Sequence, residues 1–412
     1  MTVTPTRWEV AAPNSWDAPD REWQPQARAA LEAGLRAGLA VRVVGARGHG
    51  RRALIARVAP EVTPVDLDEL GKPPVGVQVG LSVNGFSSHR FPVQAELRHS
   101  GPADAELVAS AVAHLGRFEG DAVSWLLWDA VRRYRREGRM SLLLWPLLSL
   151  ASEALSLAEG NVGAEHVHAA LAARDARRDR HLRAALRATH KGRYAVSTTG
   201  TEVGQVNGLA VYTAGQFRYG RPLRVSCSVG TGRGGVVSIE KTVGLSGDTH
   251  QKGIQVLAGY LRGRHGRRRP LSLHATLTFE QSYKKISGDS ASCAELVALL
   301  SALAEAPCRQ DLAVTGSVDQ RGRLQAIGGV VNKIEGWFRC GGAGVVLPEV
   351  NVEDLLLHPD VLEAMEKGAF ELHALSTVDQ VLELLTGEDV SAVHGRVGVE
   401  LDDLHAAGKG KK

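Results

Sequence analysis

The sequence lacks the features that mark membrane proteins and secreted proteins. No apolar run reaches about 18 residues, so no transmembrane helix is expected. The N-terminal residues combine acids with tryptophans and lack a basic segment followed by an apolar one, so we expect no secretory signal. The four cysteines have no CxxC or metal-ligand spacing, which predicts free thiols in the cytoplasm. We therefore expect no metal, no cofactor and no membrane partner.

A large excess of either charge is also missing. The net charge is +4 over 412 residues, and the basic residues gather locally at 132–136, 174–183 and 262–269. Such clusters usually form solvated helix faces or loops, and less often bind nucleic acid. Nucleic acid is therefore not the expected partner, although the clusters keep that alternative open.

The N-terminal half divides into two parts by its hydrophobic pattern. Residues 1–102 predict a small α/β segment with a helix over Gln26–Leu39 and a strand over Ala40–Val44. Residues 103–190 have a helical pattern throughout, broken at Gly120 and Gly138, and the most apolar stretch, Met140–Ala151, indicates a buried helix. We expect this second part to be an all-helical domain.

The C-terminal half has a different texture, in which strands alternate first with glycine-rich turns and then with helices. Residues 191–397 therefore predict one α+β domain, and residues 398–412, which end in Gly-Lys-Gly-Lys-Lys, predict a disordered tail. The expected strands are Gly208–Tyr212, Leu223–Val229, Gly235–Ile239, Leu271–Phe279, Leu312–Val318, Leu324–Ile327, Gly344–Leu347 and Phe370–Ala374, and the expected helices are Ser292–Ala304, Val330–Cys340 and Val378–Leu385.

One serine lies at the start of an expected helix. The string Gly288-Asp289-Ser290-Ala291-Ser292 opens an apolar-periodic segment. At a helix N-terminus the backbone N–H groups point outward and the dipole is positive, so such a site can stabilise an oxyanion. Asp and Ser are also common N-cap residues, and the residues alone favour that simpler role.

One lysine has unusually apolar neighbours. Lys333 follows Ile327-Gly-Gly-Val-Val-Asn332 and precedes Ile334. Burial disfavours the ammonium and lowers the pKa, which a lysine base requires, and Ser-Lys pairs can replace the serine–histidine arrangement of other hydrolases. A lysine that extends its ammonium to solvent from a helix face explains the same residues.

A resemblance weighs against both simpler roles. Residues from Glu202 to about Gly387 resemble the peptidase domain of the Lon family, particularly its Lon B-like branch, and Ser290 and Lys333 fit the family's register without a gap. The matching strings are Val203–Tyr212, Val243–Gly247 with Lys252-Gly253 and Gly259–Leu261, Thr278–Tyr283, Gly288–Ser292, Asp311–Gly316 and Ile327–Gly329 with Lys333.

The resemblance implies a role for each matching residue. Ser290 matches the family's nucleophile and Lys333 its general base. Thr315 matches a threonine whose hydroxyl lies close to that lysine, and Asp289 matches the acid that precedes the serine. The sequence departs from the pattern at Ser287, where a glutamate is common, which leaves the local charge in doubt.

The implied chemistry is acyl transfer through a serine. Neutral Lys333 accepts the proton of Ser290 as the hydroxyl attacks the scissile carbonyl, and backbone N–H groups at the start of the following helix are candidates for the oxyanion hole. Gly288 and Ala291 flank these groups as supporting residues. Cys293, one turn further on, is interpreted as a small core residue rather than a rival nucleophile.

Lon proteases usually carry an AAA+ ATPase before the peptidase, and the N-terminal half resembles that module only in part. The helical domain resembles the AAA+ lid through the string Gly163–His168. The turn from Gly45 to Gly50 has the glycine spacing of a phosphate-binding loop, but Arg51 and Arg52 occupy the positions of its Lys and its Mg²⁺-binding Ser or Thr. The stretch up to residue 102 is expected to be too short for the remaining strands.

These observations predict an α+β protein with a Lon-type peptidase domain, an AAA+ lid-like helical domain and a vestigial nucleotide-binding segment; an unrelated small α/β module with a glycine turn is the alternative for the last. We expect an ATP-independent Lon-like serine endopeptidase, assembled as a homo-oligomer, by resemblance a hexamer, that cleaves unfolded proteins and peptides. The alternatives are a peptidase driven by a separate ATPase partner and a non-catalytic scaffold or DNA-binding regulator.

Overall fold

The computed structural model describes residues 25–36, 41–44, 54–55, 65–66, 79–82, 93–96, 100–134, 139–178, 180–214, 217–267, 270–283 and 285–409. The chain divides into two compact units, with the division between Arg177 and Arg178. The sequence predicted a domain boundary at residue 190, which differs from this division. Helix α8 (Arg180–His190) belongs to the second unit, and Leu186 packs against the core of that unit. No helix among the described residues is long and apolar enough to cross a membrane.

The first unit begins with helix α1 (Pro25–Arg36) and a four-stranded parallel sheet in the order β2-β3-β1-β4. Its strands are β1 (Val41–Val44), β2 (Val65–Asp66), β3 (Val79–Ser82) and β4 (Val93–Glu96). The expectation that this stretch is too short for further strands is wrong, because strands of only two to four residues leave room for three more beside β1.

The rest of the first unit is mainly helical. Asp129 in α5 is buried between Arg133 and Arg174, with side-chain distances of 2.7 and 2.5 Å. The apolar stretch expected to be one helix begins as a strand, since Met140 pairs with Gly101 before α6 starts at Leu144. The elements are β5 (Ser100–Pro102), α4 (Ala105–Val112), α5 (Gly120–Tyr134), β6 (Arg139–Ser141), α6 (Leu144–Leu155) and α7 (Ala164–Arg178).

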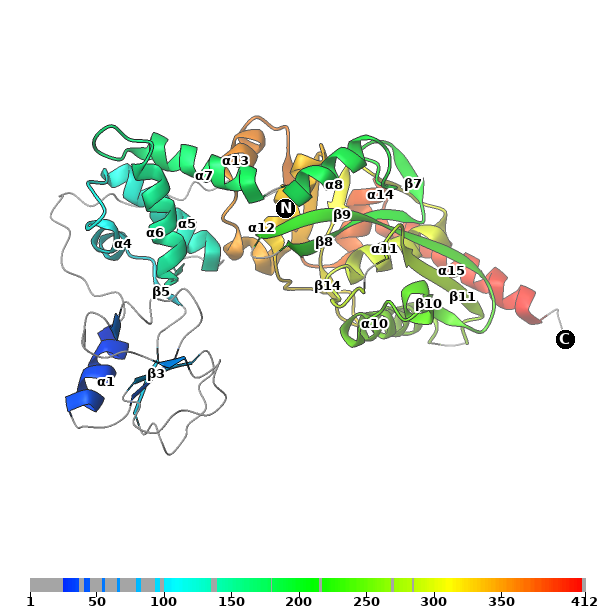
Figure 1. Ribbon diagram of the computed structural model, residues 1–412. Helices are drawn as coiled ribbons and strands as arrows, with labels where there is room; N and C mark the ends of the chain where they lie inside the picture. Colours follow the sequence, from blue (N-terminus) through cyan, green and yellow to red (C-terminus); the bar gives the residue numbers. More distant parts are fainter. Residues whose placement is uncertain are drawn as a thin grey trace. The chain divides into compact units, whose positions relative to one another are not determined.

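The second unit, green to red in Figure 1, is built on a seven-stranded mixed sheet in the order β10-β11-β9-β8-β13-β16-β17. The β8–β9 hairpin is antiparallel, whereas β8, β13, β16 and β17 run parallel to one another. Two separate two-stranded ribbons, β12-β7 and β14-β15, complete the strands of this unit. The bounds are β7 (Thr201–Val203), β8 (Gln205–Ala214), β9 (Phe217–Thr231), β10 (Gly235–Ser238), β11 (Leu273–Phe279), β12 (Pro307–Arg309), β13 (Leu312–Val314), β14 (Ser317–Val318), β15 (Leu324–Gln325), β16 (Gly344–Pro348) and β17 (Glu371–Leu375).

Helices cover both faces of this sheet, as the alternation of side chains along β13 shows. Leu312 and Val314 belong to one buried cluster, formed with α10, α11, α14 and α15, and Ala313 belongs to the other, formed with α12 and α13. The helices are α9 (Ile239–Thr242), α10 (Asp248–His265), α11 (Ser292–Ala304), α12 (Val330–Arg339), α13 (Pro359–Glu366), α14 (Val378–Thr386) and α15 (Val390–Lys409), with a 3₁₀ helix at Glu349–Asp354. Thus α11 and α12 approach the sheet from opposite faces.

The strand expected over Leu312–Val318 is wrong as one continuous strand, because β13 ends at Val314. The chain leaves the sheet after Val314, because the N–H of Thr315 still bonds to Val346 but that of Gly316 turns to the carbonyl of Ser290. The last two residues, Ser317 and Val318, form a separate ribbon with β15. The interruption lies at the carboxyl end of β13, where the helices of the two faces begin.

The disordered tail expected over residues 398–412 is also wrong as far as Lys409, where α15 ends; residues 410–412 lie outside the described residues. Val393, Val397, Leu401 and Leu404 form an apolar stripe at helical spacing, and all four are buried in the cluster that contains α11. The glycines and lysines in the sequence of this tail had concealed the stripe.

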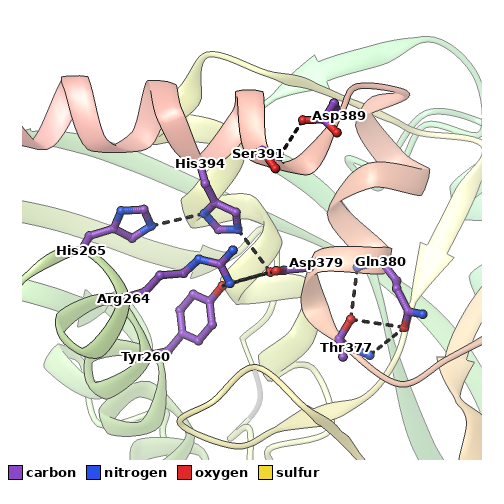
Figure 2. A network of polar contacts seen from close by, with 9 residues as sticks. All are labelled: Tyr260, Arg264, His265, Thr377, Asp379, Gln380, Asp389, Ser391 and His394. Atoms are coloured by element: carbon purple, nitrogen blue, oxygen red, sulfur yellow. Dashed lines mark hydrogen bonds and ion pairs between the residues drawn. The ribbon is translucent and has the colours of Figure 1, made fainter.

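Polar contacts also join α15 to the rest of the unit (Figure 2). Asp379 in α14 accepts hydrogen bonds from Tyr260 and from Arg264 of α10, and lies 3.2 Å from His394 Nε2 in α15. The other ring nitrogen of His394 lies 3.2 Å from His265 Nε2. These contacts fix α14 and α15 against the end of α10.

Candidate active site

Ser290, which the resemblance predicts to be the nucleophile, lies in a turn directly before α11. For this reason we call residues 287–291 the nucleophile turn. The N-cap of α11 is Ala291, and no side chain caps this helix. The residues therefore do not serve as the cap that the sequence alone favoured. The Ser290 side chain is left partly exposed and available for another contact.

Lys333 lies in the first turn of α12 and is only 2% exposed. Its position is set by a close crossing of α12 over β9, where a Cβ added at Gly220 would lie 2.0 Å from the Asn332 carbonyl oxygen and 2.7 Å from the Lys333 Cα. On the helix side, a Cβ at Gly336 would lie 2.3 Å from the Gly220 carbonyl oxygen. Two glycines therefore let α12 approach the strand closely enough to bury the lysine.

The two side chains meet at the interruption after β13. Lys333 Nζ lies 2.8 Å from Ser290 Oγ and 2.9 Å from Thr315 Oγ1. The Thr315 hydroxyl donates to the Ser290 carbonyl oxygen at 3.2 Å, and the Gly316 N–H donates to the same oxygen at 2.8 Å. The segment after β13 thus holds the serine backbone and the lysine side chain at once.

Burial lowers the pKa of Lys333 from 10.5 to about 8, against the carboxylate of Asp289, which acts to raise it. Removing an ammonium from water favours the neutral amine. A substantial share of Lys333 is therefore neutral near physiological pH, and a neutral amine at hydrogen-bond distance can accept the serine proton.

Asp289 does not contact the lysine through a hydrogen bond; it accepts one from Ser317 Oγ at 3.0 Å. Ser317 is a site residue that the sequence reasoning missed. Its position two residues after Thr315 was a signal, because residues i and i+2 of the expected strand lie on the same face of a sheet. The bond keeps the carboxylate of Asp289 at a fixed place beside Ser290 and Lys333.

The turn also presents two backbone donors. The N–H groups of Ser292 and Cys293 bond to Asp289 and Gly316 and are not available to a ligand. Those of Ser290 and Ala291 make no hydrogen bond within the described part of the chain. They are the remaining candidates for binding an oxyanion.

Gly288 and Cys293, the other described residues that the sequence singled out, make no hydrogen bond to the side chain of Ser290 or Lys333. Gly288 is exposed, and a side chain there would meet open space. Cys293 is fully buried, and burial raises its pKa to about 12, so it is not a thiolate. Within the described ranges, no group of three or more His, Cys, Asp or Glu side chains is arranged to hold a metal ion. The turn containing Gly45, Gly50, Arg51 and Arg52 lies outside the described residues.

The comparison with protein families identifies this domain. Residues 181–387 match the family described as Lon protease (S16) C-terminal proteolytic domain. The chain belongs to the Lon protease family. The matched segment contains the nucleophile turn, the interruption after β13 and the buried lysine, so the expected resemblance is confirmed.

Individual relatives agree. A Lon protease homolog of Escherichia coli K12 is 41% identical over 199 residues, which are 46% of this chain and 34% of the relative. The archaeal Lon protease of Thermococcus kodakarensis is 30% identical over 286 residues, which are 68% of this chain and 44% of the relative. The chain therefore spans less than half the length of these relatives.

Proposed function

We propose that this Lon-type proteolytic domain is an active serine endopeptidase in which Ser290 is the nucleophile and Lys333 the general base. The observation that carries the proposal is the 2.8 Å separation of Lys333 Nζ from Ser290 Oγ, made by a lysine whose pKa burial lowers to about 8. A buried amine that contacts a partly exposed hydroxyl has little structural purpose, whereas it is what a serine nucleophile requires.

The reaction proceeds in two steps that share one proton carrier. Neutral Lys333 takes the hydroxyl proton while Ser290 Oγ bonds to the scissile carbonyl carbon, and the N–H groups of Ser290 and Ala291 stabilise the oxyanion. The ammonium then gives that proton to the leaving amine as the C–N bond breaks. Water then attacks the resulting ester and passes a proton to Lys333. Lys333 returns this proton to Ser290 Oγ as the acyl C–O bond breaks, which releases the carboxylic acid and restores the Ser290 hydroxyl and the neutral lysine. Thr315 holds the lysine amine throughout.

The proposal includes independence from ATP. The parallel sheet in the first unit removes the argument that strands are missing, so independence rests on Arg51 and Arg52. An arginine can pair with phosphate but cannot bind Mg²⁺, which the Ser or Thr of a phosphate-binding loop does. Without a motor, substrates are unfolded proteins and peptides, and family relationship favours assembly as a homo-hexamer.

A labelling experiment tests the dyad directly. A serine-directed phosphonate should label the pure protein once per chain, at Ser290 by peptide mapping, and S290A should remain unlabelled. Labelling elsewhere, or none in protein that is folded by circular dichroism, would contradict the assignment.

Further measurements test the proposed independence from ATP and the proposed assembly. Unfolded casein should be cleaved at the same rate with and without Mg-ATP, and a stably folded substrate should resist. Calorimetry showing tight Mg-ATP binding, or stimulation of casein cleavage by ATP, would contradict independence.

Light scattering of active protein should give the mass of six chains; a monomer at micromolar concentration would contradict the assembly.

A further inference from the structure

A chain of three buried polar side chains lies next to the nucleophile turn and takes no part in the dyad. Ser246, His250 and Glu295 are 7%, 0% and 1% exposed. Ser246 Oγ lies 2.8 Å from His250 Nδ1, and His250 Nε2 lies 2.9 Å from Glu295 Oε1. The imidazole thus joins the start of α10 to the first turn of α11.

The two ends of this chain are fixed at the two ends of the nucleophile turn. On the entry side, Ile286 pairs with the segment that carries Ser246, through its N–H to the carbonyl of Leu245 at 2.8 Å and its carbonyl to the N–H of Gly247 at 2.7 Å. On the exit side, the Glu295 N–H donates to the Ala291 carbonyl at 3.0 Å. The side-chain contacts therefore bridge the turn from its entrance to its exit.

Two glycines bring the same segment directly against the turn. A Cβ added at Gly247 would lie 3.1 Å from the Ser287 Cα, and one at Gly253 would lie 3.4 Å from the Asp289 Cβ. His250 lies between these two contacts on α10. The opposite side of the turn is held by Thr315, Gly316 and Ser317, so the turn is clamped between two elements.

The composition of the bridge indicates geometry rather than stability as its purpose. Glu295 Oε2 has no hydrogen-bond partner among the described residues, and burial raises the pKa of this carboxyl. Burial alone would lower the pKa of His250, but the hydrogen bond and charge of Glu295, with the charge of Glu240, raise it overall. Apolar side chains of similar volume often give equal or greater stability than a buried ion pair. The contribution of this pair is therefore the fixed orientation of the two segments that it joins.

We propose that His250 and Glu295 are positioning residues that hold the nucleophile turn in its reactive shape. They keep Ser290 Oγ within reach of Lys333, and keep the N–H groups of Ser290 and Ala291 aligned for the oxyanion. They act through the backbone and touch neither substrate nor dyad. The inference rests on the proposed function of Ser290.

The test uses two near-isosteric variants and a matched control in the full-length protein. E295Q and H250Q should lower kcat for a fluorogenic peptide roughly 10- to 100-fold, because small misplacements of reacting groups cost that much, while KM stays within about twofold. Labelling of Ser290 by a serine-directed phosphonate should slow by the same factor as kcat. The double variant should lose no more than the worse single variant, because both break one bridge.

S301A is the control for loss of a buried hydrogen bond. Ser301 is fully buried on the same α11 helix, further from the turn, where its hydroxyl accepts from the Gly204 N–H at 2.9 Å. S301A should lower the unfolding temperature yet keep wild-type kcat at a temperature where near-ultraviolet circular dichroism shows every variant folded.

Each outcome decides the inference. Wild-type kcat in folded E295Q and H250Q would overturn it, as would a rise in KM alone or an equal loss of kcat in S301A. If one variant fails to fold, the other is read against S301A by the same criteria. Absence of labelling in the wild-type protein would instead refute the proposed function, and so separates the two failures.

Discussion

The pH dependence of cleavage gives the sharpest prediction, because it follows from one buried group. Lys333 must be neutral to accept the Ser290 proton, and burial lowers its pKa from 10.5 to about 8. At pH 7 the neutral fraction is about 10%, roughly 300-fold more than an unperturbed lysine would supply. In the proposed mechanism the protonated lysine cannot act as base, so kcat/KM should rise about tenfold from pH 6 to 7, reach half its maximum near pH 8, and level off above pH 9.

The assay is initial-rate hydrolysis of a fluorogenic peptide that has no titratable side chain, from pH 6 to 10 at constant ionic strength. Circular dichroism at each pH confirms that the enzyme stays folded. A rate that continues to rise tenfold per unit from pH 8 to 10 would show an unperturbed lysine and refute the burial argument. A rate that falls between pH 6 and 9 would show that another group is the base.

Five substitutions test the remaining geometry. S290A and K333A should each reduce cleavage by about 10⁴-fold or more and the double variant no further, since the pair acts as a unit; additive losses, measured by kcat, would contradict this. T315V removes the hydroxyl that holds the lysine amine and should lower kcat about fivefold, with unchanged kcat as the contrary result. G220A puts a Cβ 2.7 Å from the Lys333 Cα, so α12 must shift and activity should fall by roughly 100-fold; full activity would refute the crossing. L401A, at a 2% exposed position, should lower the free energy of unfolding by about 2 to 5 kcal/mol without changing kcat, and an unchanged urea midpoint would count against the packing of α15.

The sequence predicted most strands of the second unit and its helices α11, α12 and α14, where periodicity is strong, but it did not predict α10, α13 or α15. The helix Ser292–Ala304 agrees to the residue, and the predicted helix over 330–340 ends one residue early. These segments are almost wholly apolar or have clear glycine boundaries, so local pattern and tertiary packing agree. The disorder expected for residues 398–409 is wrong because, in the sequence, glycine, aspartate and other polar residues separate the four apolar residues of the stripe.

The site could be predicted only in part. The types and spacing of Ser290 and Lys333 were compatible with simpler roles, and the family resemblance supplied the pairing. Their meeting depends on the interruption after Val314 and on Gly220 facing Gly336, both of which arise from contacts between distant segments. Local sequence patterns cannot predict contacts between distant segments, and the bridge through His250 could not be predicted for the same reason.

The approach of Ser290 and Lys333 from opposite faces of the sheet has a consequence for when the proposed peptidase becomes active. The serine reaches the site from the α11 face and the lysine from the α12 face, and they meet only when β13 is inserted between β8 and β16. Contacts of such long sequence separation form late in folding. Under the proposed function, a newly made chain, or one that has lost its sheet, therefore has its serine but no general base beside it. Such a chain cannot cleave a peptide until the sheet is complete.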